Sequence, residues 1–99
     1  MRLSSHACEV IRQAVAEQFG EQAQVRVFGS RLDDSARGGD IDLHVSTGSA
    51  VDNPGWLSSL LAAKLQRRLD GRRVDIRLLA AGVAPQAIDR LALRQGLQL

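Results

Sequence analysis

Asp40 and Asp42 are the residues whose type and spacing point first to chemistry. One apolar residue separates them, in a run that continues as Leu43, His44 and Val45. If this run is a β-strand, its side chains alternate between two faces, so both carboxylates point to the same side. Carboxylate oxygens are the ligands that a hard divalent cation prefers. The pair therefore predicts a metal site at the start of a strand.

A glycine turn lies a short distance upstream of this pair. Gly29 and Ser30 follow the alternating apolar pattern of residues 23–28, which predicts a strand. Glycine lets a phosphate approach the backbone closely, and successive backbone N–H groups can bind an anion. Arg31 comes next and is a further candidate for contact with phosphate. The turn predicts an anion site close to the metal site.

A third acid, Asp75, lies in the predicted strand of residues 74–79. If this strand neighbours residues 40–45, Asp75 joins the face of Asp40 and Asp42. Three converging carboxylates repel one another unless a cation lies between them. Two Mg²⁺ ions about 3.5–4 Å apart stabilise the attacking and leaving oxygens of a displacement at phosphorus. An isolated Asp-x-Asp is common in turns, so the prediction depends on the whole combination.

Two basic side chains share the predicted acidic faces. His44 follows Asp42 by two residues, and Arg77 follows Asp75 by two. We interpret His44 as a structural or solvent-facing side chain. For Arg77 the sequence leaves two roles open, because it could balance the carboxylates or contact the nucleotide.

The remaining segments supply the elements that must position these residues. Helical spacing of apolar residues predicts helices over residues 4–19, 55–69 and, from near Pro85, up to Gly96. Ser4 or Ser5 is expected to cap the first helix and Gly20 to end it. Asp52 or Asn53 is expected to cap the second helix. The four arginines around its end are read as a solvated group that complements the helix dipole.

The predicted fold is α+β, in the order α-β-β-α-β-α. The short connection between the first two strands favours antiparallel pairing, whereas the helix before the third strand permits a parallel crossover. A small mixed sheet with its helices packed on one face follows. Residues 1–99 are expected to form a single domain, since no linker or repeat divides them.

Composition excludes several classes of protein. No apolar run approaches the roughly 20 residues that span a bilayer, and the first residues do not resemble a signal peptide, so we expect a cytoplasmic protein without membrane contact. The net charge is only +2, and Phe19, Phe28 and Trp56 are the only aromatic residues. Both observations argue against a nucleic-acid partner. Cys8 lies in a helical pattern and is read as a small hydrophobic residue.

The run VFGSRLDDSARGGDIDLHV resembles the nucleotidyltransferase superfamily that has the DNA polymerase β palm fold. Its signature is an apolar residue, Gly-Ser, a spacer of about ten residues and then Asp–apolar–Asp–apolar, with a third acid on a later strand. At 99 residues the chain is similar to the minimal nucleotidyltransferases, the MNT group, over nearly its whole length. It departs at Gly39, where many members have serine, which puts any contact of that hydroxyl in doubt.

The resemblance implies roles for the acids. Asp40 and Asp42 would hold two Mg²⁺ ions. Asp75 would bind the catalytic metal and would help to deprotonate or position an acceptor hydroxyl. The reaction would be transfer of a nucleoside monophosphate, with catalysis mostly by positioning and charge neutralisation.

The resemblance also implies a nucleotide site and a partner. Gly29 and Ser30 would bind the terminal phosphates of the nucleotide, with Arg31 as the next candidate. The implied biology is that of an antitoxin, which transfers AMP from ATP to a HEPN-domain toxin.

Two alternatives stay open at this stage. One is a binding module that neutralises its neighbour by complex formation, with Trp56, Leu93, Leu97 and Leu99 as candidate contact residues. The other is the catalytic subunit of a split transferase that acts on a small molecule. The sequence does not decide the nucleotide preference, the acceptor or the oligomeric state, and a homo-oligomer is not excluded.

Overall fold

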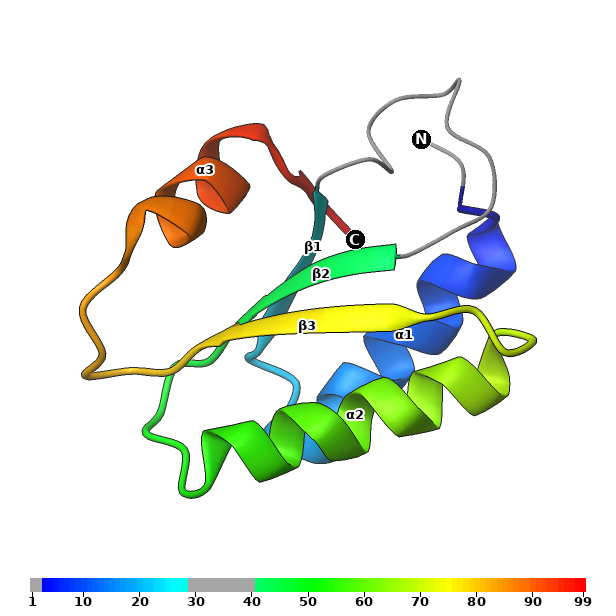
Figure 1. Ribbon diagram of the computed structural model, residues 1–99, viewed down its shortest axis with the longest axis horizontal. Helices are drawn as coiled ribbons and strands as arrows, with labels where there is room; N and C mark the ends of the chain where they lie inside the picture. Colours follow the sequence, from blue (N-terminus) through cyan, green and yellow to red (C-terminus); the bar gives the residue numbers. More distant parts are fainter. Residues whose placement is uncertain (1–2, 29–40) are drawn as a thin grey trace.

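The computed structural model describes residues 3–28 and 41–99, and the structural statements below refer to these two segments. Figure 1 shows the elements in chain order. They are α1 (Ser5–Phe19), β1 (Gln24–Phe28), β2 (Ile41–Ser46), α2 (Pro54–Arg68), β3 (Val74–Leu79), α3 (Ala87–Gln95) and β4 (Leu97–Gln98). The first six confirm the predicted α-β-β-α-β-α order, and the short β4 is an addition that the sequence pattern did not indicate.

The sheet has the strand order β3-β2-β1-β4. β1 pairs with β2 in the antiparallel direction, and β2 pairs with β3 in the parallel direction. The predicted mixed sheet is therefore confirmed. The parallel pair is possible because α2 returns the chain to the end of the sheet at which β2 begins, and β3 starts from that end as well.

β4 forms because the chain after α3 returns along β1. Gly96 ends α3, and a Cβ atom at this position would collide with the carbonyl oxygen of Ala92 and lie 3.2 Å from that of Val27. Only glycine permits this close approach. The Leu99 N–H then donates to the Val25 carbonyl at 3.0 Å, and the Leu99 side chain packs against the core.

The helix boundaries follow local signals. The Ser4 hydroxyl accepts a hydrogen bond from the Ala7 N–H at 3.0 Å, and Gly20, with φ of 94°, ends α1 as predicted. Asn53 is the N-cap residue of α2, one of the two predicted positions, but its side chain forms no capping hydrogen bond. Among the helices that the structure describes, none is both long and apolar enough to cross a membrane.

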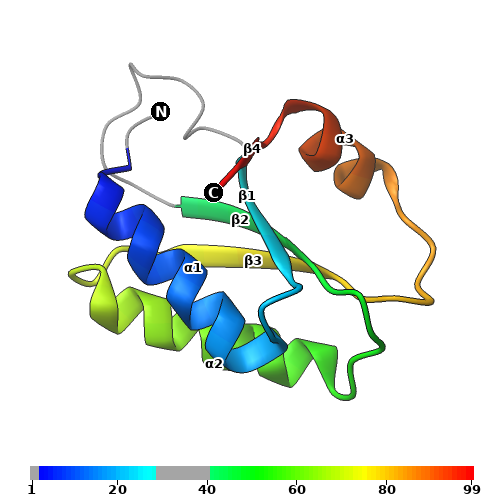
Figure 2. The same ribbon diagram turned by 180° about the vertical axis from the view of Figure 1, so that it is seen from behind.

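α1 and α2 cover one face of the sheet. Figures 1 and 2 show the two helices side by side along the same side of the strands. The core between them is built from aliphatic side chains that are buried from solvent: Ile11, Val15, Val25, Val27, Ile41, Leu43, Val45, Leu61 and Leu65. Burial of each such side chain stabilises the fold by roughly 1.5–3 kcal/mol.

α3 does not share this face, which corrects the prediction that all helices pack on one side. Its buried residues are Asp89 and Ala92, and Asp89 contacts the strand residues that point away from α1 and α2. The helix also begins later than predicted, at Ala87, because the side chain of Gln86 and that of Asp89 form a reciprocal capping box. α3 packs on the other face of the sheet because it buries a carboxylate, which the aliphatic core cannot accommodate.

Candidate active site

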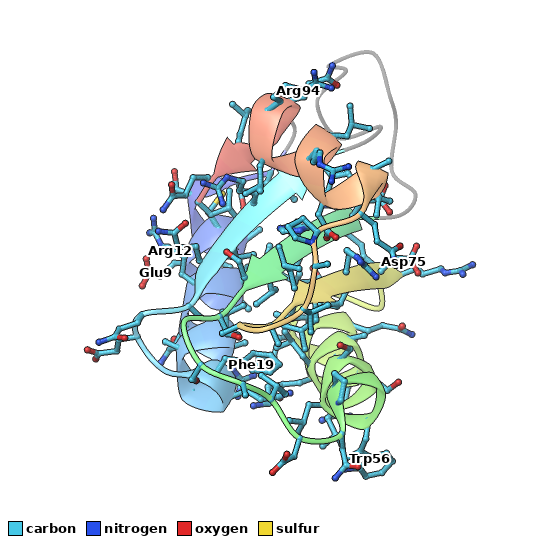
Figure 3. The ribbon with its side chains drawn as sticks, turned by 90° about the vertical axis from the view of Figure 1, so that its left-hand side faces the viewer. Glu9, Arg12, Phe19, Trp56, Asp75 and Arg94 are labelled. Atoms are coloured by element: carbon cyan, nitrogen blue, oxygen red, sulfur yellow. The ribbon has the colours of Figure 1, made fainter. Side chains whose placement is uncertain are left out.

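The acidic pair, Asp42 and Asp75, lies near the start of β2 and β3. The two residues are direct partners in the parallel register, so both side chains project to the face on which α3 lies. Figure 3 shows Asp75 near the start of β3. Its side chain is 47% exposed, and its Oδ1 atom lies 3.6 Å from Arg73 Nε. The expectation that Asp75 joins the face of Asp42 is confirmed.

The other predicted site residues, Asp40 and the turn formed by Gly29, Ser30 and Arg31, lie outside the described residues. The described residues on either side of this undescribed stretch are Phe28 and Ile41. Phe28, the last residue of β1, is the register partner of Asp42. Gly29 follows Phe28 directly, and Asp40 precedes the first residue of β2. Phe28 and Ile41, the described residues on either side, therefore lie next to the acidic pair.

One pleat further along the strands is a second group, which we call the Asp89 cluster. It consists of His44, Arg77, Asp89 and the backbone N–H of Gln86. His44 and Arg77 are register partners on β2 and β3. His44 Nε2 lies 2.9 Å from Asp89 Oδ1, and Arg77 Nε donates to the same oxygen at 3.0 Å. Arg77 Nη2 and the Gln86 N–H both donate to Asp89 Oδ2 at 2.8 Å.

The charge state of this cluster follows from its bonds. The hydrogen bonds from Arg77 hold the pKa of Asp89 far below its usual range, although burial acts in the opposite direction. Those from the Gln86 N–H and from His44 act in the same sense as Arg77. Asp89 in turn raises the pKa of Arg77 through their hydrogen bond. The pair is therefore an ionised carboxylate and a guanidinium, of which Asp89 is completely buried.

His44 is the member of the cluster that also contacts an aromatic ring. Since the Asp89 carboxylate is ionised, His44 Nε2 must carry the hydrogen of their bond. The Nδ1 atom of the same ring is buried and has no hydrogen-bond partner within the described segments. Phe28 packs its ring edge-on against His44, with centroids 6.5 Å apart. Of the two sequence-based interpretations of His44, structural or solvent-facing, the structural one is confirmed, because the side chain is completely buried.

Asp89 is the residue that the sequence analysis missed. A signal was present, because Gln86 and Asp89 have the three-residue spacing of a capping box at a helix start. That spacing predicts a helix start but not a contact with a distant strand. The two roles considered for Arg77 were balance of the acidic pair and contact with a nucleotide. The structure gives it a different partner, the carboxylate of Asp89.

The acidic pair fits a divalent cation in its chemistry. It offers hard oxygen ligands on one face, and Mg²⁺ commonly uses one or two carboxylates while water and substrate phosphate complete its octahedron. Within residues 3–28 and 41–99 no group of three or more His, Cys, Asp or Glu residues is placed to bind a metal. The described residues thus contribute two carboxylates.

Comparison with known proteins identifies the fold through solved structures, since no protein-family profile and no curated protein matches the sequence. A toxin–antitoxin structure with AMP-PNP contains a chain that is 25% identical, with a TM-score of 0.69, over 92% of this chain and 70% of that one. A variant MntA complex with two Asp-to-Glu substitutions matches at 23% identity and a TM-score of 0.69, over 92% of this chain and 70% of that one.

A third structure contains a tri-AMPylated HEPN toxin from Shewanella oneidensis in complex with an MNT antitoxin. It matches at 23% identity and a TM-score of 0.67, over 97% of this chain and 71% of that one. These likenesses extend over nearly all of the chain. The resemblance read from the sequence is therefore confirmed at the level of the fold: this chain has the α+β nucleotidyltransferase fold of the MNT antitoxins.

Proposed function

We propose that this chain is a Mg²⁺-dependent nucleotidyltransferase that transfers AMP from ATP to a hydroxyl group of a HEPN-domain partner, and so acts as an antitoxin. The observation that carries the proposal is the register of β2 and β3, which sets Asp42 and Asp75 side by side on one face. Two adjacent acids repel each other in the absence of a cation, so this arrangement is suited to metal binding. Because the reaction uses ATP, we place it in the cytoplasm.

In this proposal Asp40, Asp42 and Asp75 hold the metal, and Gly29, Ser30 and Arg31 bind the terminal phosphates. Bound Mg²⁺ would neutralise charge on the phosphates. The acceptor oxygen forms a bond to the α-phosphorus while the bond from that phosphorus to the bridging oxygen of the β-phosphate breaks. Pyrophosphate leaves with the electron pair, and Asp75 takes or directs the hydroxyl proton. Catalysis then consists mainly of positioning and electrostatic stabilisation.

The solved relatives support this assignment in three ways. One was solved with AMP-PNP, which is an ATP analogue. One contains a HEPN toxin that carries three AMP groups, bound to an MNT antitoxin. In the variant complex, the two substituted aspartates are two positions apart, the same spacing as Asp40 and Asp42 here. We infer the same acceptor class for this chain, a HEPN-domain protein.

The second candidate function is neutralisation of the partner by complex formation alone. The observation in its favour is a set of exposed apolar side chains. Trp56 is 66% exposed on α2, Leu93 is exposed on α3, and Leu97 is 47% exposed in β4. Figure 3 shows Trp56 at the start of α2, pointing away from the sheet. Leu99, which the sequence analysis grouped with these residues, packs against the core instead.

Transfer of a radioactive label separates the two functions. The chain is incubated with ATP labelled at the α-phosphate, Mg²⁺ and the protein encoded beside its gene. Transfer predicts label on the neighbouring protein, which EDTA abolishes and which Asp42→Ala and Asp75→Ala reduce by about 100-fold or more. Asp52→Ala is the matched control, because Asp52 is an exposed acid in the connection before α2, and it should leave transfer unchanged.

Neutralisation of the partner's toxicity is the measurement that can support the second function instead. If both Asp42→Ala and Asp75→Ala still neutralise the neighbouring protein and no label transfers in the wild type, complex formation is the function. Label on a small-molecule acceptor, with none on the protein, would instead support the split transferase.

A further inference from the structure

β3 is the outermost strand of the described sheet, and β2 pairs with one of its two edges. Figure 1 shows β3 beyond β2, with α2 running beside it. The Ile41 N–H donates to the Arg73 carbonyl at 2.9 Å, and the Thr47 N–H donates to the Leu79 carbonyl at 3.1 Å. Backbone groups of successive residues point to opposite edges of a strand, so the odd-numbered residues of β3 bond toward β2. The N–H and C=O groups of its even-numbered residues, 74, 76 and 78, therefore point outward.

This outer edge is suited to pairing with a further strand. β3 has six residues, contains no proline and pairs with β2 without a bulge, so it lacks two of the features that commonly block edge pairing. A hollow of about 400 Å³ lies beside it, lined by Ile76 and Leu78 of the strand and by Gly55 and Ser58 of α2. Ile76 and Leu78 are only half-buried against the core. An incoming strand would enter this hollow and cover the rest of both side chains.

The charges of β3 indicate which strand fits, because its sequence is complementary to itself when two copies run antiparallel. With Ile76 opposite Ile76 of a second copy, residue 74 pairs with residue 78, and all three outward-pointing residues form hydrogen bonds. In the same register Asp75 lies opposite Arg77 of the second copy, and Arg77 lies opposite its Asp75. Each such pair of opposite charges contributes about 0.2–1 kcal/mol, and the twofold axis creates two of them.

A shift of the register removes this match. Outward-pointing residues must stay opposite one another, so the nearest alternatives place residue 74 or residue 78 opposite residue 76 of the second copy. The first alternative sets Asp75 opposite Asp75, and the second sets Arg77 opposite Arg77. Like charges directly opposite each other destabilise a strand pair. The charges thus select the register in which the most residues of β3 form hydrogen bonds.

Both charges already have partners, and the contacts across the twofold axis are compatible with them. Asp75 is 47% exposed, and its Oδ1 atom lies 3.6 Å from Arg73 Nε, which is longer than a normal N–H···O hydrogen bond. Arg77 is 32% exposed and donates to Asp89 from Nε and Nη2, while its Nη1 group carries further N–H donors. Pairing across the interface therefore adds to these contacts and does not replace them.

We propose that the outer edge of β3 is a homodimer interface, at which two copies of this chain join their sheets by antiparallel pairing of β3 with β3. Such an interface is isologous, since each copy contributes the same residues. It also sets Arg77 of the second copy beside Asp75, at the edge of the candidate active site. The inference does not depend on the proposed reaction.

Sedimentation velocity of the full chain at increasing concentration tests this interface. The wild type should show a monomer–dimer equilibrium. Asp75→Arg sets like charges opposite each other at both pairs and should weaken dimerisation by about tenfold or more. The matched control is Glu21→Arg, which makes the same change of net charge at an exposed acid in the turn before β1. It should dimerise as the wild type does.

Three results would overturn the proposal. One is a wild-type chain that stays monomeric at about 1 mM. Another is equal weakening by Asp75→Arg and Glu21→Arg, because the effect would then be one of net charge. The third is dimerisation of Asp75→Arg with wild-type affinity, which would place the interface on another surface.

Amide hydrogen exchange, measured by nuclear magnetic resonance on the wild-type chain, locates the interface without a variant. The odd-numbered residues of 75–79 bond to β2 and should be protected at every concentration. The even-numbered residues of 74–78 should exchange rapidly in dilute solution and about tenfold or more slowly once the dimer forms. Protection that depends on concentration at every second residue indicates a paired outer edge. If exchange at residues 74–78 does not change with concentration, any dimer forms elsewhere and the proposal is wrong.

Discussion

The acidic pair and the Asp89 cluster occupy neighbouring positions on the same face of β2 and β3, yet their chemistry is opposite. Asp42 and Asp75 place two like charges side by side, and Asp75 is open to solvent. Two residues along each strand, His44 and Arg77 meet a buried carboxylate that accepts four hydrogen bonds. The difference teaches that the closed group stabilises the fold, whereas two adjacent acids, one of them open to solvent, have the capacity to bind a cation.

The largest expected effect is on stability, at the closed group. Asp89→Ala leaves Arg77 and His44 without their acceptor and should lower the free energy of unfolding by about 3–5 kcal/mol. Asp75→Ala should not lower it by more than about 0.5 kcal/mol, because the exposed ion pair of Asp75 with Arg73 contributes little and the neighbouring Asp42 repels the charge. Urea denaturation of the two variants measures both values. Equal losses would contradict the distinction between the two groups.

The reverse asymmetry is expected for AMP transfer. Asp75→Asn keeps the size of the side chain but removes its charge, and should lower the transfer rate by about 100-fold, or about 2.7 kcal/mol. Its melting temperature should be equal to or above that of the wild type. Single-turnover transfer of label from ATP gives the rate. A rate within about threefold of the wild type would remove Asp75 from the proposed mechanism.

Acid should weaken the Asp89 cluster. The pKa of Asp89 is lowered in the folded state, so its contribution to stability is fully present above the ordinary carboxyl pKa of about 4 and is lost as the pH falls below that value. The difference in unfolding free energy between wild type and Asp89→Asn should be constant, at about 2 kcal/mol, from about pH 7 to about pH 5. It should shrink below about pH 4.

Comparison with Asp89→Asn makes this measurement specific, because the other carboxylates are present in both proteins. A difference that grows as the pH falls has the wrong sign for a lowered pKa. It would show that Asp89 is not held as a carboxylate by Arg77.

The smallest expected effect lies outside both groups. Ser4→Ala removes the side-chain cap of α1 and should lower the unfolding free energy by about 1 kcal/mol. Mn²⁺ affinity should be unchanged, since α1 lies on the opposite face from the acidic pair. Parallel calorimetric titration and denaturation of this variant test whether stability and metal binding are separable. A matching loss of affinity would mean that general stability, and not the two groups, governs binding.

Part of the candidate site was predictable because it depends on local periodicity. The alternation of residues 40–45 and 74–79 places Asp42 and Asp75 on definite faces of their strands, whatever the rest of the chain does. The Gly-Ser turn and Asp40 belong to the same sequence signature, and their roles stay predictions. Asp89 was not predictable in this way, because its partners lie on strands 45 and 12 residues earlier in the chain.

The sequence by itself determined the order of the elements, the ends of α1 and the face of its strand on which each of the two acids lies. All of these depend on interactions between residues close in the chain. Only the tertiary structure decided that Asp42 stands opposite Asp75 rather than one residue away, because the register is set by the packing of α2 beneath the sheet. It also decided that α3 crosses to the other face. On that face the buried carboxylate of Asp89 is hydrogen-bonded by Arg77, His44 and the Gln86 N–H, which together offset the cost of its burial.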